Sequence, residues 1–468
     1  MLPKKSNLLF AFLILFFLFI VLPFAHAQYT KLLDFSGAAN GSNPYGSLIS
    51  DGTFLYGMTY YGGSNDMGVI FKIMPDGTGY SKLLDFGGTL NGSNPMGSLF
   101  SDSAFLYGMT QYGGANNSGI IFKIKPDGSS FSKMFVFSGV VNGSQPQGSF
   151  ISDGTFLYGM TLSGGSNNMG VIFKIKPDGT TYSKLLDFAG ATNGAAPYGT
   201  LVFDGTFLYG MTQSGGANNL GVIFKIHTDG TGYSKLLDLS TINGSNPYGS
   251  LIIDGSFLYG MTHDGGANNH GVIFKINTNG SGYSILHDFT NATDGWFPES
   301  SLISDGTFLY GTTYSGGTNT DGIIFRINLN GSGYNKLLDF SGVANGSSPY
   351  GSLIIEGNSL YGMTLSGGTN HDGVLYKVDI ATNDIPENIS TTHFNVYPNP
   401  TSKSITVSSS EKINTVEIYN LLGERIYMAS NFINQTPIEI GISDFPKGIY
   451  LAKIYTGEKI YTEKFVKQ

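Results

Sequence analysis

The chain has no cysteine and little charge. Disulfide bonds are therefore excluded, and so is a lipid on an N-terminal cysteine, which leaves packing alone to hold 468 residues together. Charged residues make up only 12%, the formal net charge is −8, and no basic cluster is visible. Nucleic acid is therefore not expected as a partner. Glycine (67), Phe (34) and Tyr (28) are abundant instead, which is typical of short strands joined by tight turns.

The first 27 residues have the pattern of a cleavable export signal. Lys4-Lys5 precedes an apolar run at 8–22, and Ala25-His26-Ala27 supplies a small-x-small cleavage site. The run is shorter than the roughly 20 residues that a membrane-spanning helix needs. We therefore expect residues 1–27 to be removed, leaving no stable transmembrane segment. A retained membrane anchor is the alternative.

A unit of about 51 residues recurs seven times between residues 28 and 380. Each copy carries Leu-Tyr-Gly, with its tyrosine at Tyr56, Tyr107, Tyr158, Tyr209, Tyr259, Tyr310 and Tyr361. The first copy contains four strand-like segments, 29–35, 47–50, 54–59 and 69–73, separated by Gly-rich turn signals. Four strands per copy and seven copies predict an all-β fold, a seven-bladed β-propeller. A parallel β-helix is the alternative, although its coils are usually much shorter.

The phase of the repeat predicts how the ring closes and how its loops divide. Segment 29–35 has no blade of its own in the sequence, so we expect it to become the outer strand of the last blade, beside 374–378. If the strands of a blade are named a to d from the axis outward, the a–b and c–d turns share one face. The d–a and b–c loops share the other. These d–a and b–c loops differ between copies, so their face, here called the variable face, is free to specialise.

Aromatic residues on the variable face are the candidate binding residues. The residue after the proline of each d–a loop is, in order, Tyr45, Met96, Gln147, Tyr198, Tyr248, Glu299 and Tyr350. The sixth copy departs most from the pattern and holds Trp296, the only tryptophan. Flat side chains with a polar edge suit sugar rings or protein patches. The predicted ligand contacts are Trp296, Tyr45, Tyr198, Tyr248 and Tyr350, with Tyr60 and Tyr314 at the rim. The alternative is that these tyrosines pack between blades.

No catalytic residue, metal ligand or cofactor is predicted. An enzyme gathers its acid, base or nucleophile from different blades, whereas the recurrent acids, such as Asp51 and Asp102, occupy the same turn in each copy. His263, Asp264 and His270 match no fixed-spacing metal motif. The sequence favours a non-catalytic surface or secreted protein that binds a glycan or protein ligand. A polysaccharide hydrolase or lyase on the same scaffold is the alternative.

The repeat pattern LYGMT…GG…GVIFKI…DG, over about 29–380, resembles the Gloeo/Verruco (GloVer) tandem repeat of bacterial exported proteins. The resemblance implies a propeller-like repeat and no agreed biochemical activity.

The repeat ends after Asp379, and a different segment follows. Residues 381–392 are polar and are interpreted as a linker. Residues 393–468 contain short alternating segments, for example 405–407 and 416–419, which predict a small Ig-like β-sandwich. Their motif residues are Tyr397, Pro398, Asn399 and Pro400, then Gly423, then Gly448 and Tyr450.

This last segment resembles the C-terminal sorting domain of the type IX (Por) secretion system. The resemblance implies a Bacteroidota-type host, recognition by the type IX secretion machinery, and delivery to the outer cell surface or the medium, with the tail removed at the surface. An ordinary Ig-like accessory domain is the alternative.

Overall fold

The computed structural model describes residues 28–290, 293–380, 395–408, 412–420, 425–430, 432, 437–456 and 459–468. The predicted signal segment (1–27), the predicted linker (381–392) and Gly423 lie outside these ranges. The chain divides into two compact units, Met1–Ala381 and Thr382–Gln468. Every regular element in the described ranges is a β-strand. These ranges contain no helix long and apolar enough to cross a membrane.

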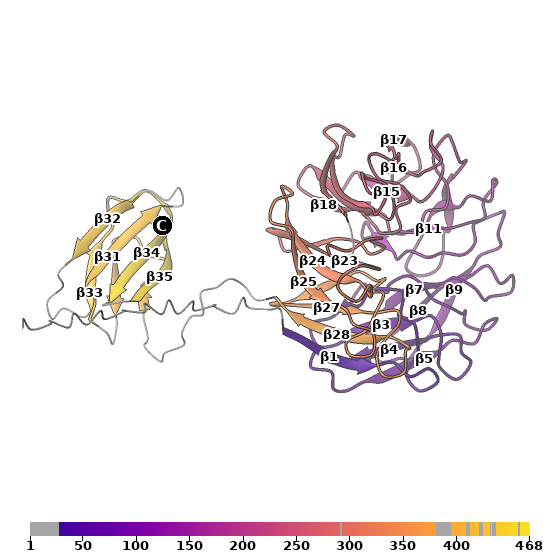
Figure 1. The fold of residues 1–468 in the computed structure, drawn as a ribbon, viewed down its shortest axis with the longest axis horizontal. Coiled ribbons are helices and arrows are strands. Elements are labelled where there is room, and N and C mark those ends of the chain that lie inside the picture. The colour runs from indigo at the N-terminus through magenta and orange to yellow at the C-terminus, as the bar shows by residue number, and fades with distance from the viewer. Residues whose placement is uncertain are drawn as a thin grey trace, which may run out of the picture. The chain divides into compact units, whose positions relative to one another are not determined.

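The first unit is a β-propeller of seven four-stranded antiparallel sheets that follow one another around a common centre (Figure 1). The first four blades, from the inner to the outer strand, are β2 (Ile49–Ser50), β3 (Leu55–Thr59), β4 (Val69–Ile73), β5 (Ser81–Asp85); β6 (Phe100–Ser101), β7 (Leu106–Thr110), β8 (Ile120–Ile124), β9 (Ser132–Val136); β10 (Ile151–Ser152), β11 (Leu157–Thr161), β12 (Val171–Ile175), β13 (Ser183–Asp187); and β14 (Val202–Phe203), β15 (Phe207–Thr212), β16 (Val222–His227), β17 (Ser234–Asp238). The last three are β18 (Ile252–Asp254), β19 (Phe257–Thr262), β20 (Val272–Asn277), β21 (Ser284–Asp288); β22 (Ile303–Ser304), β23 (Phe308–Thr313), β24 (Ile323–Asn328), β25 (Asn335–Asp339); and β26 (Ile354–Glu356), β27 (Ser359–Met363), β28 (Val374–Asp379), β1 (Gln28–Asp34).

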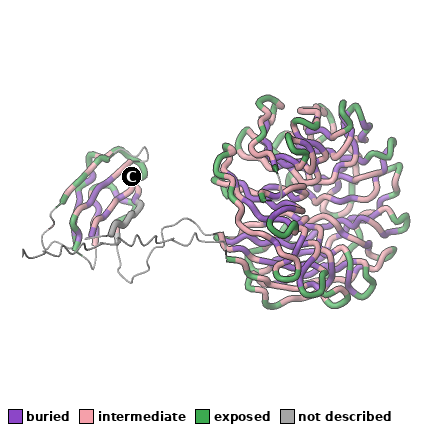
Figure 2. Tube along the Cα trace, viewed as in Figure 1, coloured by how far each residue is buried: buried purple, intermediate pink, exposed green. Residues whose placement is uncertain are grey.

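The core lies between neighbouring blades. Strand β4 is buried on both faces, with Val69, Ile70 and Phe71 fully inaccessible, which explains its nearly continuous apolar run (Figure 2). Ile70 packs with Phe86, which directly follows β5, and with residues of the second blade such as Phe122; the same layer recurs around the ring. The glycine of Leu-Tyr-Gly is required here, because a Cβ on Gly57 would lie 2.6 Å from the ring of Phe71.

The predicted closure of the ring by the first strand is confirmed. Strand β1 pairs antiparallel with β28, from Gln28 opposite Asp379 to Asp34 opposite Val374. Side chains extend the seam, since Asp34 Oδ1 accepts a hydrogen bond from the N–H of Thr369 at 3.0 Å. The last blade therefore takes its outer strand from the beginning of the described chain, and this strand covers the edge of β28.

A tight ring of main chain surrounds the axis. A Cβ added to Gly46 would collide with the carbonyl of Gly97. The equivalent glycines make the same contact up to Ser300, and again where Gly351 meets Gly46. Beside it, hydroxyl groups link successive blades: the N–H of Ser47 donates to Ser98 Oγ at 2.8 Å, and the N–H of Ser352 donates to Ser47 Oγ at 2.8 Å. The inner strands therefore meet at van der Waals distance, which only a closed ring allows.

The recurrent acids of the a–b turns have a structural role. Asp51 Oδ1 accepts hydrogen bonds from the N–H groups of Thr53 and Phe54, and its Oδ2 accepts one from the Tyr56 hydroxyl at 2.7 Å. The same arrangement recurs at Asp102, Asp153, Asp204 and Asp305. These carboxylates fix the turn and anchor the buried tyrosine, as the repetition predicts.

The second unit is a small sandwich of two antiparallel sheets. One sheet contains β29 (Asn395–Tyr397), β30 (Ser404–Ser408) and β33 (Ile438–Gly441), and the other contains β32 (Arg425–Ser430), β31 (Thr415–Asn420), β34 (Gly448–Thr456) and β35 (Lys459–Lys467). Alternate residues such as Ile405, Val416 and Ile418 form its apolar interior.

The seam predicts a test of closure. Deletion of Gln28–Asp34 removes the outer strand of the last blade, exposes the edge of β28 and uncovers part of its apolar layer. We expect the melting temperature to fall sharply, because each ladder hydrogen bond contributes about 1 kcal/mol and the packing of Leu32 and Leu33 is lost as well. Calorimetry of the shortened protein measures the change. Deletion of seven residues from 382–388 is the control of equal length, and equal melting temperatures for the two deletions would contradict the role of the seam.

Candidate functional site

Seven side chains surround the axis on the variable face, one from each d–a loop. Each of them directly precedes Gly46 or its equivalent in another copy, and those residues contact one another from blade to blade. The seven side chains therefore follow one another around the axis. We call this set the axial ring: Tyr45, Met96, Gln147, Tyr198, Tyr248, Glu299 and Tyr350. Gln147 is buried and the other six are partly exposed.

Main-chain bonds hold the d–a loop against the b–c loop of the same copy. Ser42 and Tyr61 exchange two backbone hydrogen bonds, of 3.0 and 3.1 Å, and the N–H of Tyr60 donates to the Asn43 carbonyl. Asn43 has a positive φ of 51°, a conformation that asparagine tolerates, and Pro44 then directs the chain toward the axis. Both loop types therefore share one face, as the phase of the repeat predicts.

The structure brings three predicted tyrosines together at the seam between the first and last blades. The ring of Tyr45 lies edge-on to Tyr350 at 4.9 Å between centroids and to Tyr60 at 5.1 Å. The Tyr60 hydroxyl donates to Gln111 Oε1 at 2.9 Å. Two copies of the repeat that are far apart in the sequence thus form one aromatic group.

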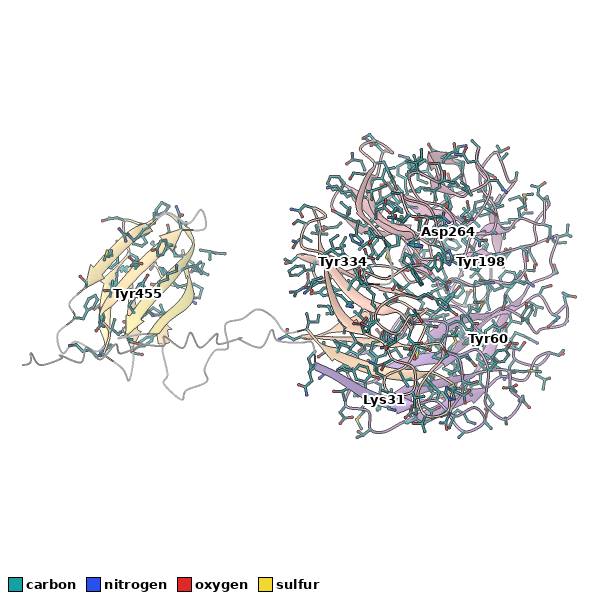
Figure 3. All side chains as sticks on the ribbon, viewed as in Figure 1. Lys31, Tyr60, Tyr198, Asp264, Tyr334 and Tyr455 are labelled. Carbon is teal, nitrogen blue, oxygen red and sulfur yellow. The ribbon has the colours of Figure 1, made fainter. Side chains whose placement is uncertain are left out.

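A second aromatic group lies in the fourth and fifth copies. Tyr198 and Tyr248 have ring centroids 4.7 Å apart, and Gln213 Nε2 donates to the Tyr248 hydroxyl at 2.8 Å. Tyr248 also contacts the imidazole of His263 at 5.2 Å. Figure 3 labels Tyr60, Tyr198 and Asp264 on the propeller.

Glu299 is the one charged member of the axial ring, and it pairs with a histidine. Its Oε1 lies 3.3 Å from His263 Nε2, while His263 Nδ1 lies 3.0 Å from Asp264 Oδ1, at ion-pair distance but without hydrogen-bond geometry. Burial disfavours the charged imidazole, but Glu299 and Asp264 outweigh it and raise the pKa of His263. Phe297 stacks on the other side of this imidazole at 4.6 Å.

The tyrosines of the axial ring stay neutral over the ordinary pH range. Burial is the main cause of their raised pKa values, and the negative charge of Glu299 raises all four further. Burial likewise raises the pKa of Tyr60 to about 12. The four tyrosines of the ring are therefore within electrostatic reach of one carboxylate.

The sixth copy is also altered beneath Glu299. Ser300 stands where six copies have glycine, and Thr312 stands where the others have methionine. The N–H of Thr312 lies 3.3 Å from Ser300 Oγ, and the Thr312 hydroxyl is buried without a hydrogen-bond partner. The sixth copy thus differs from the others both in its d–a loop and in strand β23.

Trp296 lies outside the axial ring. Its main chain pairs with Ser315, and its indole contacts the imidazole of His270 at 5.2 Å. It is connected to the axial ring through Phe297, whose ring centroid is 6.2 Å away. Tyr314 is half-buried. Of the predicted contacts, the tyrosines therefore form the centre and Trp296 an outer position.

The predicted ligand contacts did not include Glu299, Gln147 or Phe297. Among the seven equivalent positions Glu299 is the only acid, a signal that was visible in the sequence. Pairing His263 with Glu299 could not be read from spacing, because they come from different copies. His270 instead lies with Nδ1 3.2 Å from the Thr290 carbonyl. In the described ranges, no three His, Asp or Glu residues are grouped to hold a metal.

Two motif residues of the second unit, Asn399 and Tyr450, are part of its framework. Asn399 Oδ1 accepts a hydrogen bond from the N–H of Val466 at 2.9 Å, which ties this motif to the last strand. Tyr450 is buried between Phe445 and Phe465, and its hydroxyl donates to the Pro446 carbonyl at 2.8 Å. The other motif residues are exposed: Tyr397, Pro398, Pro400 and Gly448.

Comparison with known families decides the affiliation. The Gloeobacter/Verrucomicrobia repeat matches residues 18–156, 141–306 and 253–413. The chain belongs to this repeat family. A second model, the secretion system C-terminal sorting domain, matches residues 395–468. This repeat protein is therefore exported through the type IX system, to the cell surface or the medium.

Solved structures agree with the propeller fold. An oligogalacturonate lyase in complex with manganese is 12% identical, with a TM-score of 0.50, covering 75% of this chain and 93% of the lyase. A GH74 xyloglucanase from Xanthomonas campestris is 12% identical, with a TM-score of 0.51, covering 82% of this chain and 59% of the xyloglucanase. No curated protein matches the chain. At this identity the likenesses bear on the fold alone.

The cluster around His263 predicts a pH-dependent contribution to stability. Because the folded-state pKa is raised, the stabilisation is complete below the unfolded pKa of about 6.5 and is lost as the pH rises through the folded value. We expect His263→Gln to lower the free energy of unfolding more at pH 5.5 than at pH 8.5, measured by urea denaturation. The exposed His371, changed to Asn, is the control. Equal losses for His263→Gln at both pH values would contradict the ion-pair assignment.

Proposed function

We propose that this protein is a non-catalytic surface or secreted binding protein, whose propeller recognises an extracellular glycan through the axial ring. The observation that carries the proposal is the grouping of four tyrosines, from copies one, four, five and seven, around one carboxylate at the axis. Partly exposed tyrosine faces offer apolar area with a polar edge, which suits the faces and hydroxyl groups of sugar rings. A protein ligand on the same face remains the second outcome of the tests.

The arrangement of the acids favours binding over hydrolysis. A glycosidase uses two carboxyl groups that flank the bond to be cleaved. Here Glu299 and Asp264 both contact one imidazole, at 3.3 and 3.0 Å, so neither faces the other across an open space. The recurrent aspartates on the opposite face are occupied by turn hydrogen bonds. A screen for polysaccharide degradation, run beside a glycan array with the full mature chain, separates the two functions.

The ring predicts how binding responds to substitution. Once a glycan is found, Tyr198→Ala should weaken its binding by about 1–3 kcal/mol, as for a central contact of an interface. Tyr198→Phe is the matched control and should retain most of the affinity, because the aromatic face remains. Trp296→Ala tests whether the site extends outward to the sixth copy, again by titration calorimetry. Unchanged affinity in Tyr198→Ala, with normal folding, would remove the axial ring as the site.

The second unit predicts the route of export. Deletion of residues 395–468 should retain the propeller in the periplasm, because the sorting domain is absent, and fractionation of the cells measures this. As a complementary control, residues 381–468 placed behind a reporter with an export signal should carry it to the surface. Normal surface amounts of the truncated propeller would show that sorting does not depend on this unit.

A further inference from the structure

The axial ring has a chemical bias that a neutral sugar does not require. It contains four tyrosine rings, one carboxylate and one amide, and none of its seven members carries a positive charge. Aromatic faces have a negative electrostatic potential, so tyrosines around a carboxylate attract a cation more strongly than either group alone. The net effect is a negative centre at the axis of the variable face.

Glu299 has a tyrosine on each side in the axial ring. It follows Tyr248 and precedes Tyr350 around the axis, and its charge also raises the pKa of Tyr45 and Tyr198, which are the next neighbours on either side. Its side chain retains 12% exposure, so it can be reached from the variable face.

A second acceptor is present on the other side of the ring. Gln147 stands three positions from Glu299 around the axis and is only 7% exposed. Its Oε1 is buried without a hydrogen-bond partner. An unpaired buried acceptor is costly, and a ligand that brings N–H donors would satisfy it.

We propose that the axial ring binds an organic ammonium group, carried by an amino sugar of the recognised glycan. The ammonium lies among the tyrosine faces, with Glu299 as its counter-charge, and donates to Gln147 when it carries N–H groups. This inference rests on the proposed function and specifies the ligand that the same site takes.

His263 competes with such a ligand for Glu299. The groups that face this imidazole are Glu299 at Nε2, Asp264 at Nδ1, and the rings of Tyr248 and Phe297. Tyr248 stays neutral because its pKa is raised. A protonated His263 therefore neutralises the charge of Glu299. Cation binding should strengthen as the pH rises and His263 loses its proton.

Choline is the first probe, because its quaternary charge does not change with pH. We expect titration of the full mature protein at pH 8.0 to detect binding of choline. Glu299→Gln should weaken the affinity for choline about tenfold, which corresponds to 1.4 kcal/mol. Glu356→Gln removes an equal charge from the a–b turn of the last blade, on the opposite face, and should leave the affinity unchanged. If Glu299→Gln and Glu356→Gln behave alike, the proposal is wrong.

A variant that should bind choline more strongly tests the proposal independently, because misfolding could only weaken the binding. Met96 is a partly exposed member of the axial ring, so Met96→Glu adds a second carboxylate and should strengthen choline binding several-fold, whereas Met96→Gln should not. In the unaltered protein the affinity should also rise several-fold between pH 5.5 and pH 8.0. This rise should disappear in His263→Gln. A flat pH profile in the unaltered protein would overturn the role of Glu299 as counter-charge.

The final comparison identifies the source of the ammonium group. A glucosamine trimer should bind, and the N-acetylated trimer, which lacks the charge, should bind at least about tenfold more weakly. Tighter binding of a lysine peptide than of the glucosamine trimer would overturn the assignment to a glycan. If neutral glycans bind through the tyrosines while choline and glucosamine do not, the proposed function stands and this inference fails. If no glycan of any charge binds, both fail.

Discussion

Closure of the ring is the constraint on which the rest of this structure depends. The residues next to the axis meet main chain to main chain, from Gly46 to Gly97 and onward to Ser300, and Gly351 returns to Gly46. Hydroxyl groups beside them bond to the next blade, and β1 pairs with β28 on the outside. Removal of a blade would break the main-chain contacts and the hydroxyl bonds that link it to its neighbours. The apolar layers between blades then have a fixed spacing, and each layer is covered by its neighbour.

This constraint explains why the two faces of the propeller differ in how much they vary between copies. On the a–b face, five copies have a short turn fixed by an aspartate such as Asp51, whose oxygens are already occupied. On the variable face, backbone bonds between the d–a and b–c loops hold the loop shape, as between Ser42 and Tyr61. Because main chain supplies that support, the loop shape does not depend on the identity of the side chain after the proline. That side chain can differ between copies, and in the sixth copy it is Glu299.

The sixth copy concentrates these differences. Glu299, His263, Phe297 and Trp296 form a connected group, and Ser300 with Thr312 alters the wall below it. One altered copy makes the axial ring asymmetric, with Glu299 on one side and Gln147 on the other. The type IX sorting unit then delivers this asymmetric face to the exterior of the cell.

Most of the fold could be predicted from the sequence, and the pairing within the site could not. The regular period determined the four-stranded unit, the seven copies and the closure by residues 29–35, because each copy must bury its apolar face against the next. Copy-to-copy differences also selected the variable face and its tyrosines. Only the tertiary structure decided that Tyr45 contacts Tyr350. It also decided that His263 pairs with Glu299 and not with His270. Trp296, finally, lies outside the axial ring. Those contacts join side chains from different copies, and their distances depend on how blades curve around the axis, which no local spacing encodes.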